Sequence, residues 1–286
     1  AAENRRATGH CVRPSRAMAS IPAPLEAPRS TRGPFQLAVG VLVVTLLTVV
    51  KGAMTTSTGS GLAFRDWPTS DGEFMPERSL HTVPGFLEPR LRDVRFYFPS
   101  AMHSLGDTGF GEGRAWWHLD MQTLQQLQTA DLEALRAFRE KEPEGLPAAR
   151  KALKAFVNEV MNQTGLPFNA LVLGGFSQGA MLATDVTLRL EEAPAALAVL
   201  SGTLLVESQW RPKAQQRAGL KVFQSHGTVD PVLRYDAALV LRQMLSDAGA
   251  QLEFVEFAGG HGIPQSVLTR LAAFLGQSLQ HRSRGT

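Results

Sequence analysis

The chain has 286 residues, of which 44% are hydrophobic, and a formal net charge of +3. This length suits one large domain or one domain with an appendage, and the apolar content is ample for a packed core. The single cysteine, Cys11, excludes an internal disulfide framework and a cysteine-based metal site, and the weak net charge gives no indication of a nucleic-acid-binding surface.

The basic excess lies in residues 1–34, where six arginines stand against two glutamates. This segment is rich in Arg, Ala, Pro and Ser and has no sustained periodicity, so we expect a disordered basic leader. The rest of the chain is then close to neutral.

An uncharged run follows, from Gly33 to Val50. Its length is at the short end for a transmembrane helix, which needs about 17–25 residues. We therefore expect a transmembrane helix, and membrane association, through residues 33–50. The alternative is a buried strand, because Val41–Thr45 is rich in β-branched residues.

Residues 35–88 form a segment of their own in this interpretation. Gly52–Phe64, Asp66–Gly72 and Pro84–Glu88 resemble the end of the first membrane helix, and the loop after it, of heme A synthases. That family has a histidine shortly after the glutamate, whereas Pro89 and Arg90 follow here. Heme ligation needs paired histidines on a helix bundle, so we expect no cofactor.

From about Leu91 onward, short apolar runs alternate with helical patterns. The expected strands are Val94–Phe98, Ala170–Leu173, Ala195–Leu200, Leu220–Phe223 and Leu252–Phe257. The expected helices are one or two within residues 121–138 and one each within 149–164, 179–190, 237–245 and 267–275. This alternation predicts an α/β domain over residues 89–286, with a parallel sheet covered by helices on both faces.

The sequence Gly175-Phe176-Ser177-Gln178-Gly179 connects an expected strand with an expected helix. A G-x-S-x-G pattern in this position is typical of a nucleophile elbow, a sharp turn that presents the serine above the sheet edge. It predicts Ser177 as a nucleophile and the backbone N–H of Gln178 as a donor to the developing oxyanion. The alternative is an ordinary Gly/Ser turn.

An activated serine needs a base, and the base needs a carboxylate that orients it. Asp230 follows one buried strand and His261 follows the last strand, so both are expected at the sheet edge that carries Ser177. His226 is a rival base, but it precedes the acid in the chain and we expect it to be structural. Asp236, the rival acid, falls at the start of a helix, and His118 is expected at the rim of the pocket.

Taken together, these motifs resemble the phospholipase/carboxylesterase family, which includes acyl-protein thioesterases, over residues 91–277. The matching stretches are Arg95–Ala101, Gly113–Trp117, Gly174–Ala180, Leu200–Gly202, His226–Val232 and Gly260–His261. The resemblance implies an α/β-hydrolase that cleaves esters or thioesters of short to medium acyl chains, with Ser177, His261 and Asp230 as its triad. It also leads us to expect Trp116, Trp117, Phe176 and Thr203 at the substrate, and no metal ion.

One part of that family's pattern is missing. The family opens with a central strand ending in Leu-His-Gly-x-Gly, whose loop donates a second oxyanion N–H, and Ser79–Thr82 is only a superficial echo of it. We therefore expect the sheet to lack this first strand, unless Val41–Val50 takes its place beside the elbow strand. Two other functions stay open: a membrane-anchored heme A synthase-like fragment and a non-catalytic hydrolase-like module. We expect a cytoplasmic location, with or without a membrane anchor.

Overall fold

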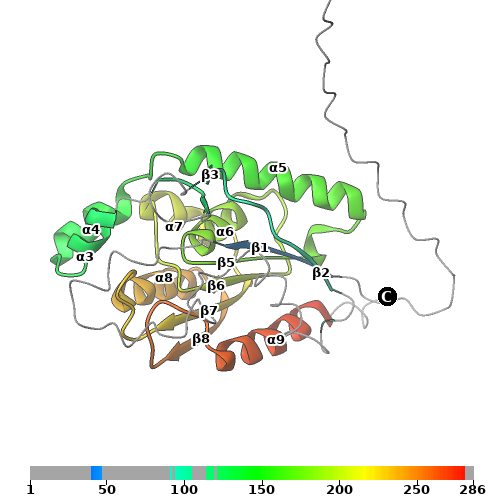
Figure 1. The fold of residues 1–286 in the computed structure, drawn as a ribbon. Coiled ribbons are helices and arrows are strands. Elements are labelled where there is room, and N and C mark those ends of the chain that lie inside the picture. Colours follow the sequence, from blue (N-terminus) through cyan, green and yellow to red (C-terminus); the bar gives the residue numbers. More distant parts are fainter. Residues whose placement is uncertain (1–39, 47–90, 92–93, 105–113, 119–120, 281–286) are drawn as a thin grey trace, which may run out of the picture. The chain divides into compact units, whose positions relative to one another are not determined.

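A parallel sheet of six strands organises the residues that the computed structural model describes, which are 40–46, 91, 94–104, 114–118 and 121–280 (Figure 1). They belong to one compact unit, residues 37–286. The predicted leader, the glycine-rich loop at 106–113 and most of the 35–88 segment lie outside the described residues. The sheet order is β2-β1-β5-β6-β7-β8, with bounds Val94–Tyr97, Gly40–Leu46, Leu171–Phe176, Ala196–Leu200, Lys221–Gly227 and Gln251–Phe257.

Seven α-helices lie among the described residues. Their bounds are α3 Met121–Leu127, α4 Leu132–Glu140, α5 Leu146–Thr164, α6 Gln178–Arg189, α7 Glu207–Gln215, α8 Tyr235–Asp247 and α9 Gln265–Gln280. Local chemistry sets several of these ends. Asp131 caps α4 by accepting the N–H of Ala134 at 2.9 Å, and α5 ends at Gly165, whose φ of 63° suits glycine. The described residues also include a two-stranded antiparallel pair, β3 (His103–Ser104) with β4 (Arg114–Ala115), and a short 3-10 turn at Phe168–Ala170.

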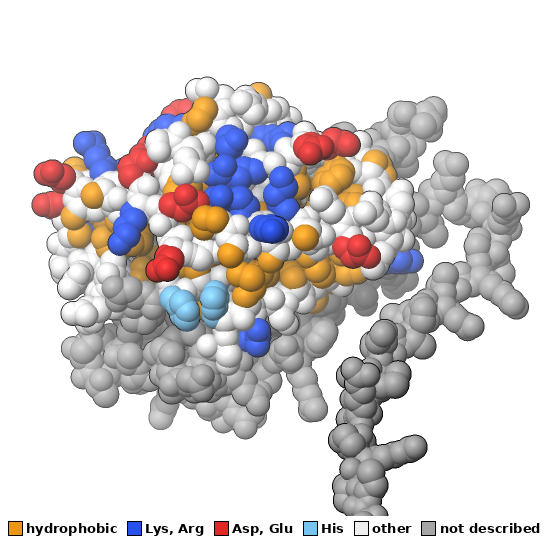
Figure 2. All heavy atoms as spheres, turned by 90° about the horizontal axis from the view of Figure 1, so that it is seen from above, with side chains coloured by type: hydrophobic (Ala, Val, Ile, Leu, Met, Phe, Trp, Pro, Cys, Tyr) orange, Lys and Arg blue, Asp and Glu red, His pale blue; other side chains and the backbone are white. Residues whose placement is uncertain are grey.

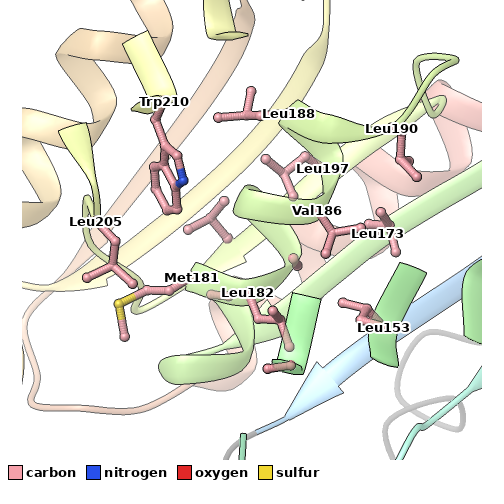
Figure 3. Packing of buried hydrophobic residues seen from close by; sticks show 14 of the residues in the cluster. Leu153, Leu173, Met181, Leu182, Val186, Leu188, Leu190, Leu197, Leu205 and Trp210 are labelled. Carbon is pink, nitrogen blue, oxygen red and sulfur yellow. The ribbon is translucent and has the colours of Figure 1, made fainter. Parts of the chain in front are cut away.

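Helices cover both faces of the sheet, as the sequence predicts, and Figure 1 shows α9 across the sheet from α5 and α6. The alternation of strand side chains divides the core accordingly. Leu171 and Leu173 of β5 face the cluster formed with α5, α6, α7 and α8, and Figure 3 shows part of this cluster around Leu182 and Trp210. Val172 and Phe176 of the same strand belong to the second cluster, which α9 completes.

Strand β1 corrects the expectation of a transmembrane helix. Gly40–Leu46 is a parallel strand, with Leu42 opposite Phe96 of β2 and Leu46 opposite Phe176 of β5. A valine-rich segment that pairs with a strand on each side suits a parallel sheet. Strands of such sheets are continuous apolar runs, as short membrane helices are, so the sequence fits either structure. Strand β1 thus fills the position beside the elbow strand β5, where the family's first strand was expected to be missing. No helix among the described residues is long and apolar enough to cross a membrane.

Helix α6, which follows the predicted nucleophile, is anchored by a buried carboxylate. Asp185 is fully buried and accepts hydrogen bonds from Arg189 Nε at 3.0 Å and Trp210 Nε1 at 2.8 Å, and it pairs with Arg150 of α5. Figure 2 views the molecule from the α5 side and shows basic side chains gathered there among acidic ones. A buried carboxylate surrounded by donors in this way fixes α6 against both α5 and α7.

Candidate active site

Ser177 lies in the sharp turn between β5 and α6. Its φ of 54° and ψ of −121° are outside the regions that L-residues usually adopt, and such strain persists only where the surroundings enforce it. The Ser177 N–H donates to Leu200 O of β6 at 2.8 Å, and its carbonyl accepts the N–H groups of Ala180 and Met181. The turn is therefore held on both sides, as a nucleophile elbow requires.

Gln178 ties this turn to the segment that carries the two tryptophans. Its side chain is fully buried, where Oε1 accepts the N–H of Trp116 at 2.7 Å and Nε2 donates to Trp117 O at 3.0 Å. As the first residue of α6, Gln178 has a backbone N–H with no acceptor within the helix. These two side-chain hydrogen bonds hold Gln178, and with it this backbone N–H, in place next to Ser177.

Asp230 accepts hydrogen bonds on both carboxylate oxygens. Oδ1 accepts the N–H groups of Val232 at 2.8 Å and Leu233 at 2.9 Å, and Oδ2 lies 2.7 Å from Nδ1 of His261. Burial would raise the pKa of Asp230, but the charge and hydrogen bond of His261, helped by the bond from the Leu233 N–H, hold it below its ordinary value of 3.8. Asp230 is therefore an ionised carboxylate at neutral pH.

His261 is oriented by that carboxylate and lies beside the elbow. Its ring is 4.7 Å from the ring of Phe176, the residue before Ser177, measured between centroids. Because Nδ1 faces a carboxylate, it carries the proton, and Nε2 keeps its lone pair. Within the part of the chain that the structure describes, this buried Nε2 has no hydrogen-bond partner. The structure thus brings Asp230 and His261, two of the three residues expected to form the triad, into contact.

Two close approaches position the loop that carries His261. Gly227 ends β7 where a Cβ would lie 2.3 Å from the carbonyl oxygens of both Gly259 and Gly260, so only glycine fits. Ser201 donates its hydroxyl to Gly262 O at 3.2 Å and its N–H to Ser225 O at 2.9 Å. The sequence indicated neither role, although Ser201 lies in one of the family-like stretches.

His226, the rival base, contacts Asp230, which the sequence did not indicate. His226 is fully buried, and its Nε2 lies 3.3 Å from Oδ2 of Asp230 as well as 2.9 Å from Leu233 O. Asp236 lies in the first turn of α8, as expected, and pairs with Arg234 rather than with either histidine.

The other predicted site residues fall into two groups. Trp116, Trp117 and Thr203 are buried, both indoles within the cluster that faces α5, and Thr203 Oγ1 lies 3.6 Å from Met181 Sδ. His118 is exposed, with its ring 4.5 Å from that of His103. No group of three or more His, Cys, Asp or Glu side chains in the described ranges is placed to hold a metal ion.

Known proteins resemble this chain in sequence and in fold. The family model for phospholipase/carboxylesterase matches residues 130–279. Acyl-protein thioesterase 1 of Neurospora crassa is 26% identical over 194 residues, covering 66% of this chain and 76% of that protein. Its counterpart from Eremothecium gossypii is 27% identical over 196 residues, covering 67% of this chain and 77% of that protein.

Solved structures agree on the fold. The crystal structure of esterase PE8 has a TM-score of 0.61 and 26% identity, covering 83% of this chain and 92% of that one. Arabidopsis thaliana SOBER1 gives a TM-score of 0.61 at 17% identity, with 85% and 99% covered, which supports the fold alone. The heme A synthase resemblance finds no support in these relatives, and the one stretch of it that the structure describes is β1.

The family model covers more than half of the chain and extends from α4 through the last helix, taking in Ser177, Asp230 and His261. The strand order around the elbow and the paired acid and histidine fit the same α/β-hydrolase fold. The chain belongs to the phospholipase/carboxylesterase family.

Proposed function

We propose that this protein is a serine hydrolase that cleaves carboxylic esters or thioesters of short to medium acyl chains through an acyl-enzyme on Ser177. The observation that carries the proposal is the buried Asp230–His261 pair, 2.7 Å apart, whose unpartnered Nε2 belongs to a ring in contact with the residue before Ser177. A histidine with one nitrogen fixed by a carboxylate and a lone pair on the other is a general base.

The reaction proceeds in two halves. Ser177 Oγ bonds to the acyl carbon while its proton passes to His261 Nε2, and the oxyanion that forms accepts the N–H of Gln178. The bond to the leaving alcohol or thiol then breaks, and His261 returns the proton to that oxygen or sulfur. Water next attacks the acyl-enzyme with His261 again as base, which releases the carboxylic acid and restores the serine hydroxyl.

The family and its members support this substrate class. The family description names carboxylesterases, and the relatives at 26–27% identity are acyl-protein thioesterases. Both activities use the same acyl transfer to serine and differ only in the leaving group. Ester and thioester substrates with one acyl chain therefore separate the two cases.

The test compares p-nitrophenyl butyrate with a butyryl thioester, using the full chain and Ser177→Ala. We expect the substitution to lower kcat at least about 1000-fold on whichever substrate is cleaved, because no other group replaces the nucleophile. Ser278→Ala is the matched control, since this serine is also buried but lies in α9. Hydrolysis by Ser177→Ala at the wild-type rate, or none by the wild type, would contradict the proposal.

A further inference from the structure

His226 is a buried ionisable group for which the proposed reaction has no use. It lies near the end of β7, and its side chain has no exposed surface. The Asp230 carboxylate is reached by this histidine as well as by His261, because the chain turns back after Gly227 and brings residues 226 and 230 together. One oxygen, Oδ2, thus faces two imidazole rings.

The neighbours of His226 determine which nitrogen carries its proton. Nε2 lies 2.9 Å from Leu233 O and 3.3 Å from Asp230 Oδ2, and both of these oxygens are acceptors. Nε2 must therefore be protonated and donate. Nδ1 is buried and has no hydrogen-bond partner among the described residues. These contacts favour a neutral ring with its proton on Nε2.

Electrostatics agree with this assignment. Burial lowers the pKa of His226 below its ordinary value of 6.5, in spite of the attraction of Asp230 and the bond to Leu233. The other ionisable groups near it are His261, which opposes a second positive charge, and Tyr235 and Glu256, which hydrogen-bond to each other. A neutral His226 leaves the negative charge of Asp230 to compensate His261 when that ring becomes protonated.

The contacts also explain what the ring does mechanically. Asp230 Oδ1 is fixed by two backbone N–H groups, at Val232 and Leu233, whereas Oδ2 accepts from the side chain of His261. The Nε2–H of His226 donates to Leu233 O, in the same turn, and this bond fixes the ring with Nε2 at 3.3 Å from Oδ2. A ring fixed in this position limits rotation of the carboxylate away from His261.

We propose that His226 is a positioning residue: its ring, fixed by the hydrogen bond from Nε2–H to Leu233 O and lying 3.3 Å from Asp230 Oδ2, keeps that oxygen directed at Nδ1 of His261. This inference rests on the proposed function for its effect on rate, but its effect on His261 does not require turnover. His226 itself transfers no proton in the reaction.

The test uses a pair of substitutions that differ in the donor. His226→Gln places an amide N–H near the position of Nε2, whereas His226→Phe keeps an aromatic ring, although a larger one, and removes the donor. We expect the Phe variant to lose about 10- to 100-fold in kcat with KM within about 2-fold, because a loosened Asp230 misplaces the base. The Gln variant is expected to stay within about 5-fold of the wild-type kcat, on the same reasoning.

A second readout is independent of hydrolysis. The Nδ1–H proton resonance of His261, followed by NMR in a Ser177→Ala background, reports its hydrogen bond to Asp230 directly. We expect this resonance to move upfield in the Phe variant and to recover in the Gln variant, because a loosened carboxylate weakens the bond. The ring resonances of exposed His118 are the internal reference and are expected to be the same in all variants. If the Phe variant does not fold, His226→Asn replaces it, because its shorter amide cannot reach Oδ2.

The outcomes separate the two proposals. An upfield shift of the His261 Nδ1–H resonance that Gln reverses supports positioning even if the wild type hydrolyses nothing, in which case only the proposed function fails. An unchanged Nδ1–H resonance of His261 in the Phe variant would overturn the positioning role. So would equal losses of kcat in the Gln and Phe variants accompanied by equal losses of thermal stability, which would indicate a structural residue.

Discussion

Gly227→Ala tests whether the close approach between β7 and the loop of His261 positions the active site. The added Cβ would lie 2.3 Å from two carbonyl oxygens, Gly259 O and Gly260 O, where ordinary contact begins at 3.4 Å. The shortfall is about 1 Å, and it involves backbone on both sides rather than a flexible side chain that can turn away. The loop carrying His261 must therefore move.

The magnitude follows from two effects. Forcing an extra methyl into a packed site costs about 1–3 kcal/mol of unfolding free energy. A displacement of about 1 Å at a catalytic base costs on the order of 100-fold in kcat. We expect both losses together, because the same loop also accepts the N–H of Val229 at Gly259 O and the hydroxyl of Ser201 at Gly262 O.

Ester hydrolysis and urea denaturation measure the two losses on the same preparation. Gly276→Ala is the control, since a Cβ there meets nothing within 4 Å and the residue lies inside α9. Alanine in a helix interior is expected to stabilise it by up to about 1 kcal/mol without changing kcat. Wild-type kcat and stability in Gly227→Ala would refute the argument that this contact positions His261.

Three further predictions concern the same region. In urea denaturation between pH 8 and pH 3, stability is expected to fall first below pH 6.5, because folding disfavours the charged form of His226, and again below pH 3.8, as Asp230 loses the charge that folding favours. His226→Gln should remove only the first decline, and an unchanged profile in this variant would contradict the assignment of that decline to His226. Gln178→Leu leaves the Trp116 N–H and Trp117 O without partners, so a loss of about 1–3 kcal/mol in stability is expected, with kcat reduced more than KM is raised. An unaltered melting temperature and kcat would show that these two side-chain hydrogen bonds have no role. Asp230→Asn is expected to lower kcat by roughly 10⁴-fold and His261→Ala at least as much, and a mild effect of both would contradict the assigned roles.

The sequence predicted most of the sheet and the meeting of the acid with the histidine. Strands β5 to β8 appear as short apolar runs before turn residues, and parallel strands bring their carboxyl ends to one edge. That rule placed Asp230 and His261 together although 31 residues separate them. Helix α7 escaped prediction because Pro212 lies inside it and its sequence is polar, with Trp210 and Ala214 its buried residues.

One wrong prediction, the membrane helix, and one missed contact, that of His226, have physical causes of their own. The run containing Gly40–Leu46 is uncharged and β-branched, and periodicity cannot distinguish a strand buried on both faces from a membrane helix of minimal length. The unfilled position in the sheet, flanked by β2 and β5, and the β-branched content favour the strand. For His226, chain order predicts a structural role but carries no information on its contact with Asp230, which depends on the turn at Gly227.

The central claim is that Ser177 is an activated nucleophile, and covalent labelling tests it most directly. A fluorophosphonate reacts only with a serine whose oxygen is made nucleophilic by its base. We expect one label per chain by intact mass, located on Ser177 by peptide mapping, absent in Ser177→Ala and strongly slowed in His261→Ala. An unlabelled wild type, or a label on another serine that persists in Ser177→Ala, would contradict the claim.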